Sequence, residues 1–163
     1  EPLTVSQSLP GIDGVVIVTT PQEVALLDSR KSINFAKTIS IPVLGVVENM
    51  RGYNLRGTSA PDSKIAVRGP GGVPIECPSD GDGNWEIPLD VFKSGGGEEA
   101  SKEMGVPFLG SLPFDPGIVR GGDDGVHRII AEPDGETARA FQSIVESVLE
   151  QLDKGSQRTL RII

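Results

Sequence analysis

The chain has 163 residues, of which 37% are apolar, and this length and composition suit one domain with a single core. Its 23 acidic residues outnumber its 15 basic ones, and the net charge of −8 argues against a nucleic-acid binder that tracks phosphates with clustered Lys and Arg. Without an apolar run long enough to span a membrane, and with Cys77 as its only cysteine, the chain is expected to be cytoplasmic and to bind neither nucleic acid nor membrane.

The first predicted elements are two strands joined by a helix. Residues 15–20 and 43–47 are continuous apolar and β-branched runs, the pattern of strands that are buried on both faces of a parallel sheet. The segment 21–40 between them suits a crossover helix, which completes a βαβ unit. The apolar face of this helix is predicted to contain Val24, Leu27, Phe35 and Ile39.

The next segment, 51–94, loses this periodicity and is rich in Gly, Pro, Asp and Ser. It is predicted to be a long irregular insertion that contains a loop around Cys77. Its short apolar runs, 65–67 and 85–87, are candidates for a hairpin with each other.

The remaining residues predict a helix, a strand and a last helix. The short helix covers 98–104, the strand covers 107–112, and the last helix runs from its N-cap Asp134 to Gly155. The whole order predicts an α/β fold with helices layered on a mostly parallel sheet, in which ligands lie outside the carboxyl ends of the strands.

Three segments together resemble a known family. They are the run 15–28 with its Thr-Thr-Pro-Gln turn, the run 43–50 ending in Glu-Asn-Met, and the run 107–116 with its Pro-Phe-Asp turn. In combination they resemble the Mrp/ApbC family of deviant P-loop ATPases, MinD- and ParA-like proteins that are associated with carrying iron–sulfur clusters. The resemblance implies that residues 1–163 are a single partial domain, the C-terminal half of a three-layer domain of P-loop NTPase type.

The resemblance also implies a binding site for the adenine ring of ATP. In the family this ring is flanked by the Asn of the Glu-Asn-Met run and by the Pro-x-Asp turn, which correspond to Asn49 and to Pro113, Phe114 and Asp115. An amide side chain does offer both a donor and an acceptor to a base edge. The alternative is that Asn49 caps a strand end and Asp115 caps the helix that begins at Pro116.

No phosphate-binding loop is present in these 163 residues, because the pattern G-x-x-x-x-G-K-[ST] does not occur. Gly95-Gly96-Gly97 precedes a helix, but Glu98 and Glu99 would repel a phosphate there, so the glycines are interpreted as a hinge. The resemblance implies that the P-loop, the Mg²⁺-binding Asp and the switch segments lie before Glu1. The chain alone is therefore expected to be inactive as an ATPase.

Cys77 is the one candidate metal ligand. Family members typically carry Cys-Pro-x-Cys-Gly in this interval, and pairs of these cysteines from two subunits hold a bridging iron–sulfur cluster. Here the run is Cys77-Pro78-Ser79-Asp80-Gly81, with Asp in place of the second Cys. The resemblance implies a homodimeric cluster carrier that works with recipient or assembly proteins. The alternative is a non-catalytic interaction module that has lost cluster binding and has a free surface thiol.

Two further patterns are a candidate metal loop and a candidate ion pair, and for the ion pair an interface role in the family is an alternative to a structural one. Asp80, Asp82 and Asn84 imitate the start of a calcium loop but lack its later Gly and Glu, so a solvated acidic turn is predicted. Asp28 and Lys31 have the spacing of an intrahelical ion pair.

Overall fold

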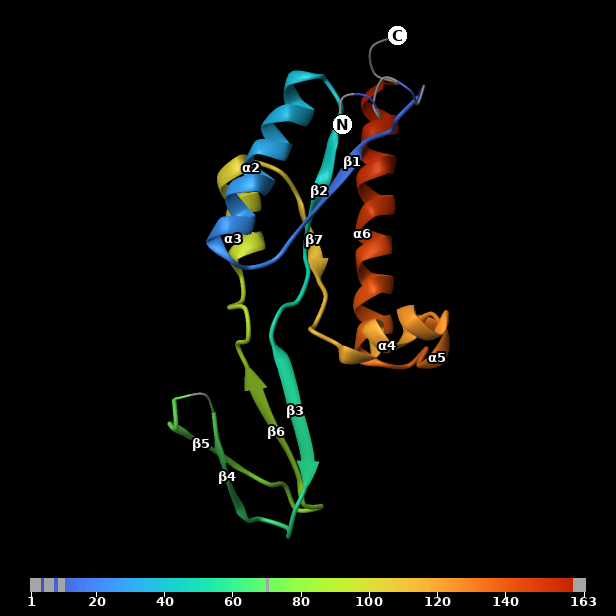
Figure 1. Cartoon of the computed structure of the whole chain (residues 1–163). Helices are drawn as coiled ribbons and strands as arrows, with labels where there is room; N and C mark the ends of the chain where they lie inside the picture. Colours follow the sequence, from blue (N-terminus) through green and yellow to red (C-terminus); the bar gives the residue numbers. More distant parts are fainter. Residues whose placement is uncertain (1–3, 5–7, 9–10, 70, 160–163) are drawn as a thin grey trace. The chain divides into compact units, whose positions relative to one another are not determined.

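The computed structural model describes residues 4, 8, 11–69 and 71–159, and the chain divides into two compact units (Figure 1). We call residues 1–51 and 92–163 the body, and residues 52–91 the arm. Each unit has its own hydrogen-bonded strands, and each is described by itself.

Among the described residues, the body is built on a three-stranded parallel sheet in the order β1–β2–β7. The strands are β1 (Val15–Thr19), β2 (Val43–Glu48) and β7 (Phe108–Ser111). The register places Thr19 beside Glu48, and Glu48 beside Ser111, so the three strands end at the same level. The predicted α/β fold with a parallel sheet is confirmed for the body.

Helices cover both faces of this sheet. They are α2 (Glu23–Thr38), α3 (Gly96–Met104), α4 (Pro116–Asp124), α5 (Arg128–Ala131) and α6 (Glu136–Thr159). Helices α2 and α3 lie on one face and α6 lies on the other, which gives three layers (Figure 1). Helices α4 and α5 form the connection between β7 and α6.

Two helix ends follow their sequence signals, whereas the two ends of the last helix do not. Gly105 adopts the left-handed conformation, with φ 63°, where α3 ends. Asp115 caps α4 by accepting a hydrogen bond from the backbone of Gly117, with Pro116 at the first helical position. The predicted bounds of the last helix, N-cap Asp134 and end at Gly155, are both wrong, because α6 begins at Glu136, directly after Gly135, and continues through Thr159. An interior glycine costs a helix only about 1 kcal/mol and does not by itself stop it.

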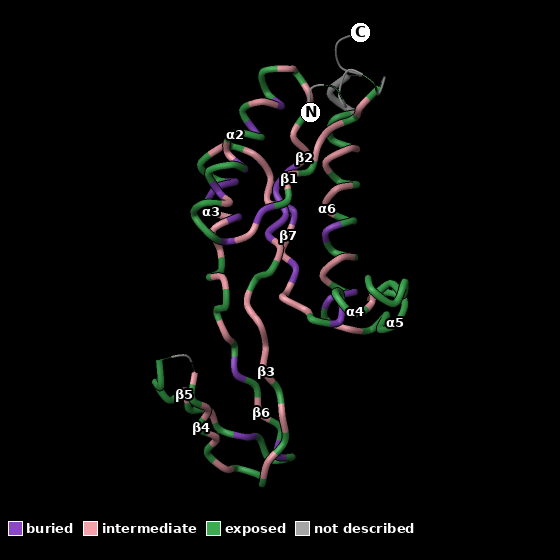
Figure 2. Tube along the Cα trace, in the orientation of Figure 1, coloured by how far each residue is buried: buried purple, intermediate pink, exposed green. Residues whose placement is uncertain are grey.

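The buried side chains form one layer on each face of the sheet. On the α6 side the core contains Val47, Leu109, Leu112 and Ile144, with Ala140, Phe141 and Val148 packed against it. The remaining buried apolar residues described in the body are Leu26, Ile33, Ala36, Val46, Ala100 and Ala138. Figure 2 shows these buried positions concentrated along the sheet and on the helix faces that meet it.

The prediction that β1 is buried on both faces is wrong. Its residues alternate, with Val16 37% exposed and Val18 61% exposed, whereas Thr19 is buried. The strand pairs only with β2 among the described residues, and α6 contacts β2 and β7 instead. An apolar strand face is therefore left uncovered at this edge of the sheet.

The predicted apolar face of α2 is also displaced. The helix buries Leu26, Ile33 and Ala36, whereas Val24 is 77% exposed and Leu27 is 55% exposed. A 3.6-residue period shows that a helix has an apolar stripe, but two overlapping stripes fit this sequence. The packing surface that the sheet and α3 provide selects one of them.

The arm is not the irregular insertion that was predicted for 51–94. Its described residues form β3 (Tyr53–Thr58), β4 (Lys64–Arg68), β5 (Pro74–Pro78) and β6 (Asn84–Leu89). Strand β3 pairs with β6 and β4 pairs with β5, both antiparallel, so the runs 65–67 and 85–87 do not pair with each other. Most of the Gly, Pro and Asp residues that suggested irregularity punctuate the turns between short strands.

The arm is held by one cross-strand aromatic contact and one group of hydroxyls. Trp85 lies opposite Gly57, and a Cβ at that glycine would collide with the indole ring. The buried Ser79 hydroxyl donates to the carbonyl of Ala60 at 2.8 Å and accepts from the backbone of Ser63 at 2.8 Å. Together with the buried Ile87, these contacts give the arm a small interior of its own.

Candidate functional site

The carboxyl ends of the three parallel strands meet at one edge of the body. Beyond the strands, the backbone of Asn49 donates to the carbonyl of Thr19 at 2.7 Å, and the backbone of Leu112 donates to the carbonyl of Glu48 at 2.8 Å. The backbone of Arg51 donates back to the carbonyl of Leu112 at 2.9 Å. These bonds place the Asn49 turn side by side with the segment that leads into Pro113, where an α/β sheet binds its ligands.

Asn49 caps its own turn and still has one hydrogen-bonding group available. Its Oδ1 accepts from the backbone of Met50 at 2.9 Å, and Met50 has a left-handed backbone with φ 61°. Within the described part of the chain, the amide nitrogen of Asn49 donates no hydrogen bond. The capping role is therefore observed, and the half-buried amide keeps a donor for a ligand.

Asp115 is occupied by partners within its own chain. Its carboxylate accepts from the backbone of Gly117 at 2.7 Å, from Arg128 Nε at 2.8 Å and from Thr137 Oγ1 at 2.7 Å. Burial alone would raise the pKa of Asp115, but these hydrogen bonds and the charge of Arg128 outweigh it and hold the pKa below its ordinary value of 3.8. The side chain thus fixes the turn, and the carbonyl of Asp115 accepts from the backbone of Ile118 at 3.0 Å.

Phe114 contacts the segment that returns from the arm. Its ring meets the ring of Phe92 edge to face, with centroids 5.9 Å apart and an interplanar angle of 61°. Phe92 is the first residue of the body after the arm. The aromatic pair therefore packs the strand-end segment against another segment of the body.

The three glycines before α3 hold a carboxylate from the same chain. Glu48, whose side chain is 0% exposed, accepts from the backbone of Gly95 at 3.0 Å and of Gly97 at 2.6 Å. These donors are already used, so the glycines are not a cradle for phosphate in this structure. This contact between the glycines and the strand end has no signal in the sequence, because Glu48 and Gly95 are 47 positions apart.

Cys77 lies on a strand, not in a loop as was expected. It is half-buried on β5, where its cross-strand partner is Ile65. Among the described residues, no group of three or more His, Cys, Asp or Glu side chains gathers in a way that would hold a metal ion. One chain therefore offers a single thiol and no complete ligand set in the residues described.

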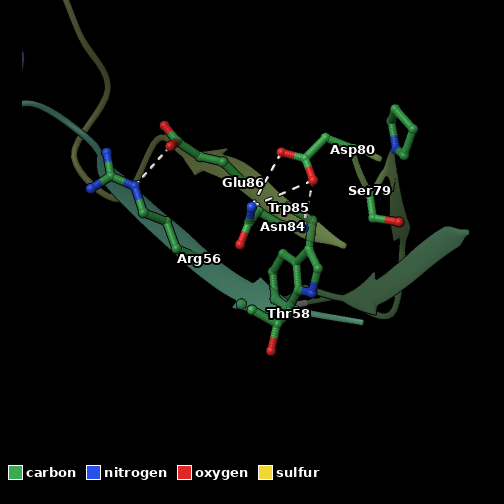
Figure 3. Close-up of a pocket in the computed structure, with 9 residues that line it drawn as sticks. Arg56, Thr58, Ser79, Asp80, Asn84, Trp85 and Glu86 are labelled. Carbon is green, nitrogen blue, oxygen red and sulfur yellow. Dashed lines mark hydrogen bonds and ion pairs between the residues drawn. The ribbon is translucent and has the colours of Figure 1, made fainter. Parts of the chain in front are cut away.

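Asp80 closes the turn between β5 and β6. Its Oδ1 accepts from the backbone of Asp82 at 3.0 Å and of Asn84 at 2.8 Å, and the Asn84 amide lies beside the same carboxylate (Figure 3). The bond from the Asn84 backbone is the largest cause that lowers the pKa of Asp80. The acidic turn predicted here in place of a calcium loop is confirmed.

An open pocket of about 710 Å³ lies on the arm around this turn (Figure 3). Its walls include Trp85 and an ion pair between Arg56 and Glu86, with Nε and Oε2 2.7 Å apart. The charges of Arg56 and Glu86 offset each other, and the lining also includes the carboxylate of Asp80. On the body, the predicted pair of Asp28 and Lys31 is confirmed at 3.1 Å, and both side chains are exposed.

Comparison with known proteins assigns the chain to a family. Residues 1–69 and 77–149 match the ParA family of NUBPL iron-transfer P-loop NTPases. The chain is 36% identical over 153 residues to an iron–sulfur cluster carrier protein of Methanocaldococcus jannaschii, and 38% identical over 152 residues to one of Methanococcus maripaludis. These matches cover 94% and 93% of this chain but only 43% of each relative.

Solved structures agree on the fold. The cell division ATPase MinD of Pyrococcus furiosus matches 85% of this chain with a TM-score of 0.54 and 22% identity, and the match covers 43% of that structure. MinD of Pyrococcus horikoshii, complexed with Mg-ADP, matches 83% of the chain with a TM-score of 0.53. None of the described helices is both long and apolar enough to cross a membrane. The chain belongs to the Mrp/NUBPL-type, ParA- and MinD-like P-loop NTPase family of iron–sulfur cluster carriers, and it spans less than half the length of the relatives it matches.

Proposed function

We propose that this protein is an ATP-binding carrier of iron–sulfur clusters and that the chain supplies the side of the site that binds the base. The observation that carries the proposal is the convergence of the Asn49 turn and the Pro113 segment at the carboxyl ends of the parallel strands. In this proposal the Asn49 amide donates to the adenine edge, and the backbone of Pro113, Phe114 and Asp115 lines its other side. Asp115 itself holds that backbone in place.

The phosphates and Mg²⁺ are proposed to be bound by a part of the protein outside these 163 residues. The chain has no G-x-x-x-x-G-K-[ST] motif, and it spans 43% of its relatives. The uncovered Val16 and Val18 of β1 support this proposal, because an apolar strand face at the edge of a parallel sheet is ordinarily covered. The residues described here would then form the C-terminal half of the domain and would not hydrolyse ATP alone.

The cargo is proposed to be held between two copies of the chain in a cytoplasmic homodimer, before its transfer to recipient or assembly proteins. One thiol per chain cannot complete a cluster site, whereas two chains together bring two copies of Cys77. The iron–sulfur cluster is the substrate of this carrier.

A second candidate function is an interaction module that has lost its cluster. The specific observation that favours it is the turn at Asp80, whose carboxylate accepts hydrogen bonds from Asp82 and Asn84. Both backbone donors bind Oδ1 and the Asn84 amide lies 3.4 Å from Oδ2, so iron bound at Asp80 would compete with groups of the turn for this carboxylate.

The base site predicts that adenosine binds the chain weakly and that Asn49→Ala weakens this binding about fivefold, because one hydrogen bond to the base edge is lost. Titration with adenosine, followed by the backbone amide resonances of residues 48–51, 111–112 and 114–115, measures the affinity. Asn34→Ala, on the exposed surface of α2, is the matched control. Equal affinities for the native chain and Asn49→Ala would remove Asn49 from the site.

The cluster site predicts that anaerobic reconstitution gives the native chain iron and visible absorbance, and that Cys77→Ser abolishes both. Asp80→Cys is expected to bind iron more firmly, because it restores the second thiolate. Asp80→Asn is the matched control, since its amide oxygen can still accept from the turn and it adds no thiol. If only Asp80→Cys acquires a cluster, the native protein has lost cluster binding and the second candidate function, an interaction module, is correct.

A further inference from the structure

The buried carboxylate of Glu48 has no part in the site as proposed so far. It stands at the end of β2, one residue before Asn49, and its side chain is 0% exposed. Each of its two oxygens accepts a different backbone donor, Oε1 from Gly95 and Oε2 from Gly97. Arg51 Nε lies 3.9 Å from Oε1. We call this arrangement of Glu48, Gly95 and Gly97 the carboxylate clasp.

The glycines are required by the clasp for steric reasons. A Cβ at Gly97 would lie 2.9 Å from the Glu48 Cβ and 3.1 Å from Oε2, closer than side chains ordinarily approach. Gly95 has a left-handed backbone, with φ 82°. The clasp therefore needs a carboxylate at the strand end and small, conformationally free residues at the start of α3.

The clasp fixes the turn that carries Asn49. On the side before Asn49, Glu48 is bound through its side chain to α3 and through its carbonyl to the backbone of Leu112. On the side after it, Arg51 donates through its backbone to Leu112 and through Nη1 to Ser111 Oγ at 3.1 Å. Between these anchors Met50 holds a left-handed backbone, which a residue other than glycine keeps only when its surroundings enforce it.

We propose that Glu48 is a positioning residue for the base site, acting through Asn49. By binding the strand end to α3, the clasp maintains the strained turn and keeps the Asn49 amide directed to the place of the base. This inference rests on the proposed function, and it assigns a binding role to a residue that does not touch the ligand.

The test is a double-mutant cycle with Glu48→Gln and Asn49→Ala, using adenosine as the probe. Gln presents one oxygen and one NH₂, so one backbone donor of the clasp would face another donor. Glu48→Gln is expected to weaken adenosine binding about fivefold, and in the double variant it should add no loss to that of Asn49→Ala. Glu99→Gln, exposed on α3, is the matched control and should bind adenosine as the native chain does.

Gly97→Ala tests the clasp from its other side and leaves Glu48 and Asn49 unchanged. It is expected to reproduce the weaker adenosine binding of Glu48→Gln, whereas Gly122→Ala, which meets no neighbouring atom, should not. The inference is wrong if Glu48→Gln and Gly97→Ala weaken adenosine binding by the same factor in the native chain and in the Asn49→Ala background. The clasp would then have a structural role only. If Asn49→Ala binds adenosine as tightly as the native chain, the proposed base site itself is wrong. This outcome is distinct from a failure of the positioning role of Glu48 alone.

Discussion

Asp115→Ala is expected to destabilise the body by about 2–3 kcal/mol. Three groups donate to this carboxylate, and the substitution would leave Arg128, Thr137 and the first turn of α4 without their acceptor. Urea unfolding followed by far-UV circular dichroism measures the effect, because the described helices all lie in the body. Trp85 fluorescence would report on the arm instead.

The control for this prediction lies on the same helix. Asp123→Ala replaces an exposed carboxylate of α4 and should change the free energy of unfolding by no more than about 0.5 kcal/mol. An Asp115→Ala variant as stable as Asp123→Ala would show that the hydrogen bonds of Asp115 add nothing to stability.

The same carboxylate predicts a pH dependence. Its hydrogen bonds hold the folded-state pKa of Asp115 below 3.8, so its stabilising contribution is complete above the unfolded-state pKa and is lost as the pH falls through the folded-state pKa. The difference in unfolding free energy between the native chain and Asp115→Asn should therefore be constant near neutral pH and shrink in acid below about pH 4. A difference that grows as the pH falls would contradict this assignment.

Mg-ATP is expected to bind this chain at least about a hundredfold more weakly than it binds the full-length relative from Methanocaldococcus jannaschii, a difference of about 2.7 kcal/mol. Phosphate and Mg²⁺ contacts supply most of the attraction for a nucleoside triphosphate. Contacts to the base alone leave little net free energy of binding after the entropic cost of association. Calorimetry on the two proteins measures both affinities.

Adenosine provides the control for the Mg-ATP comparison. Because it carries no phosphate, it should bind the two proteins with affinities within about tenfold of each other if the base side of the site is contained in this chain. Equal affinities for Mg-ATP would instead mean that these 163 residues contain a phosphate site that their sequence does not reveal.

The candidate site was only partly accessible from the sequence. Asn49 and the 113–115 segment were identified by resemblance, and the parallel-sheet pattern predicted that such strand-end turns would meet. The carboxylate clasp was not predicted, because a strand end and a glycine run far along the chain become partners only when α3 packs beside β2. The sequence predicted the acidic turn at Asp80, and the hydrogen bond that Asn84 donates to it is local to that turn.

Local chemistry in the sequence determined the three strands of the body, the helices α2, α3 and α6, and the caps at Asp115 and Gly105, whereas the family was identified by resemblance. A cap or a β-branched run acts within a few residues, so it can be recognised from the amino-acid sequence alone. Tertiary structure alone decided which of the two stripes of α2 is buried, that one face of β1 is uncovered, and that 52–91 forms paired strands. Each of these three features depends on the surface that a distant segment presents. A hydrophobic period shows which face of an element is apolar, but it does not show which other element packs against that face.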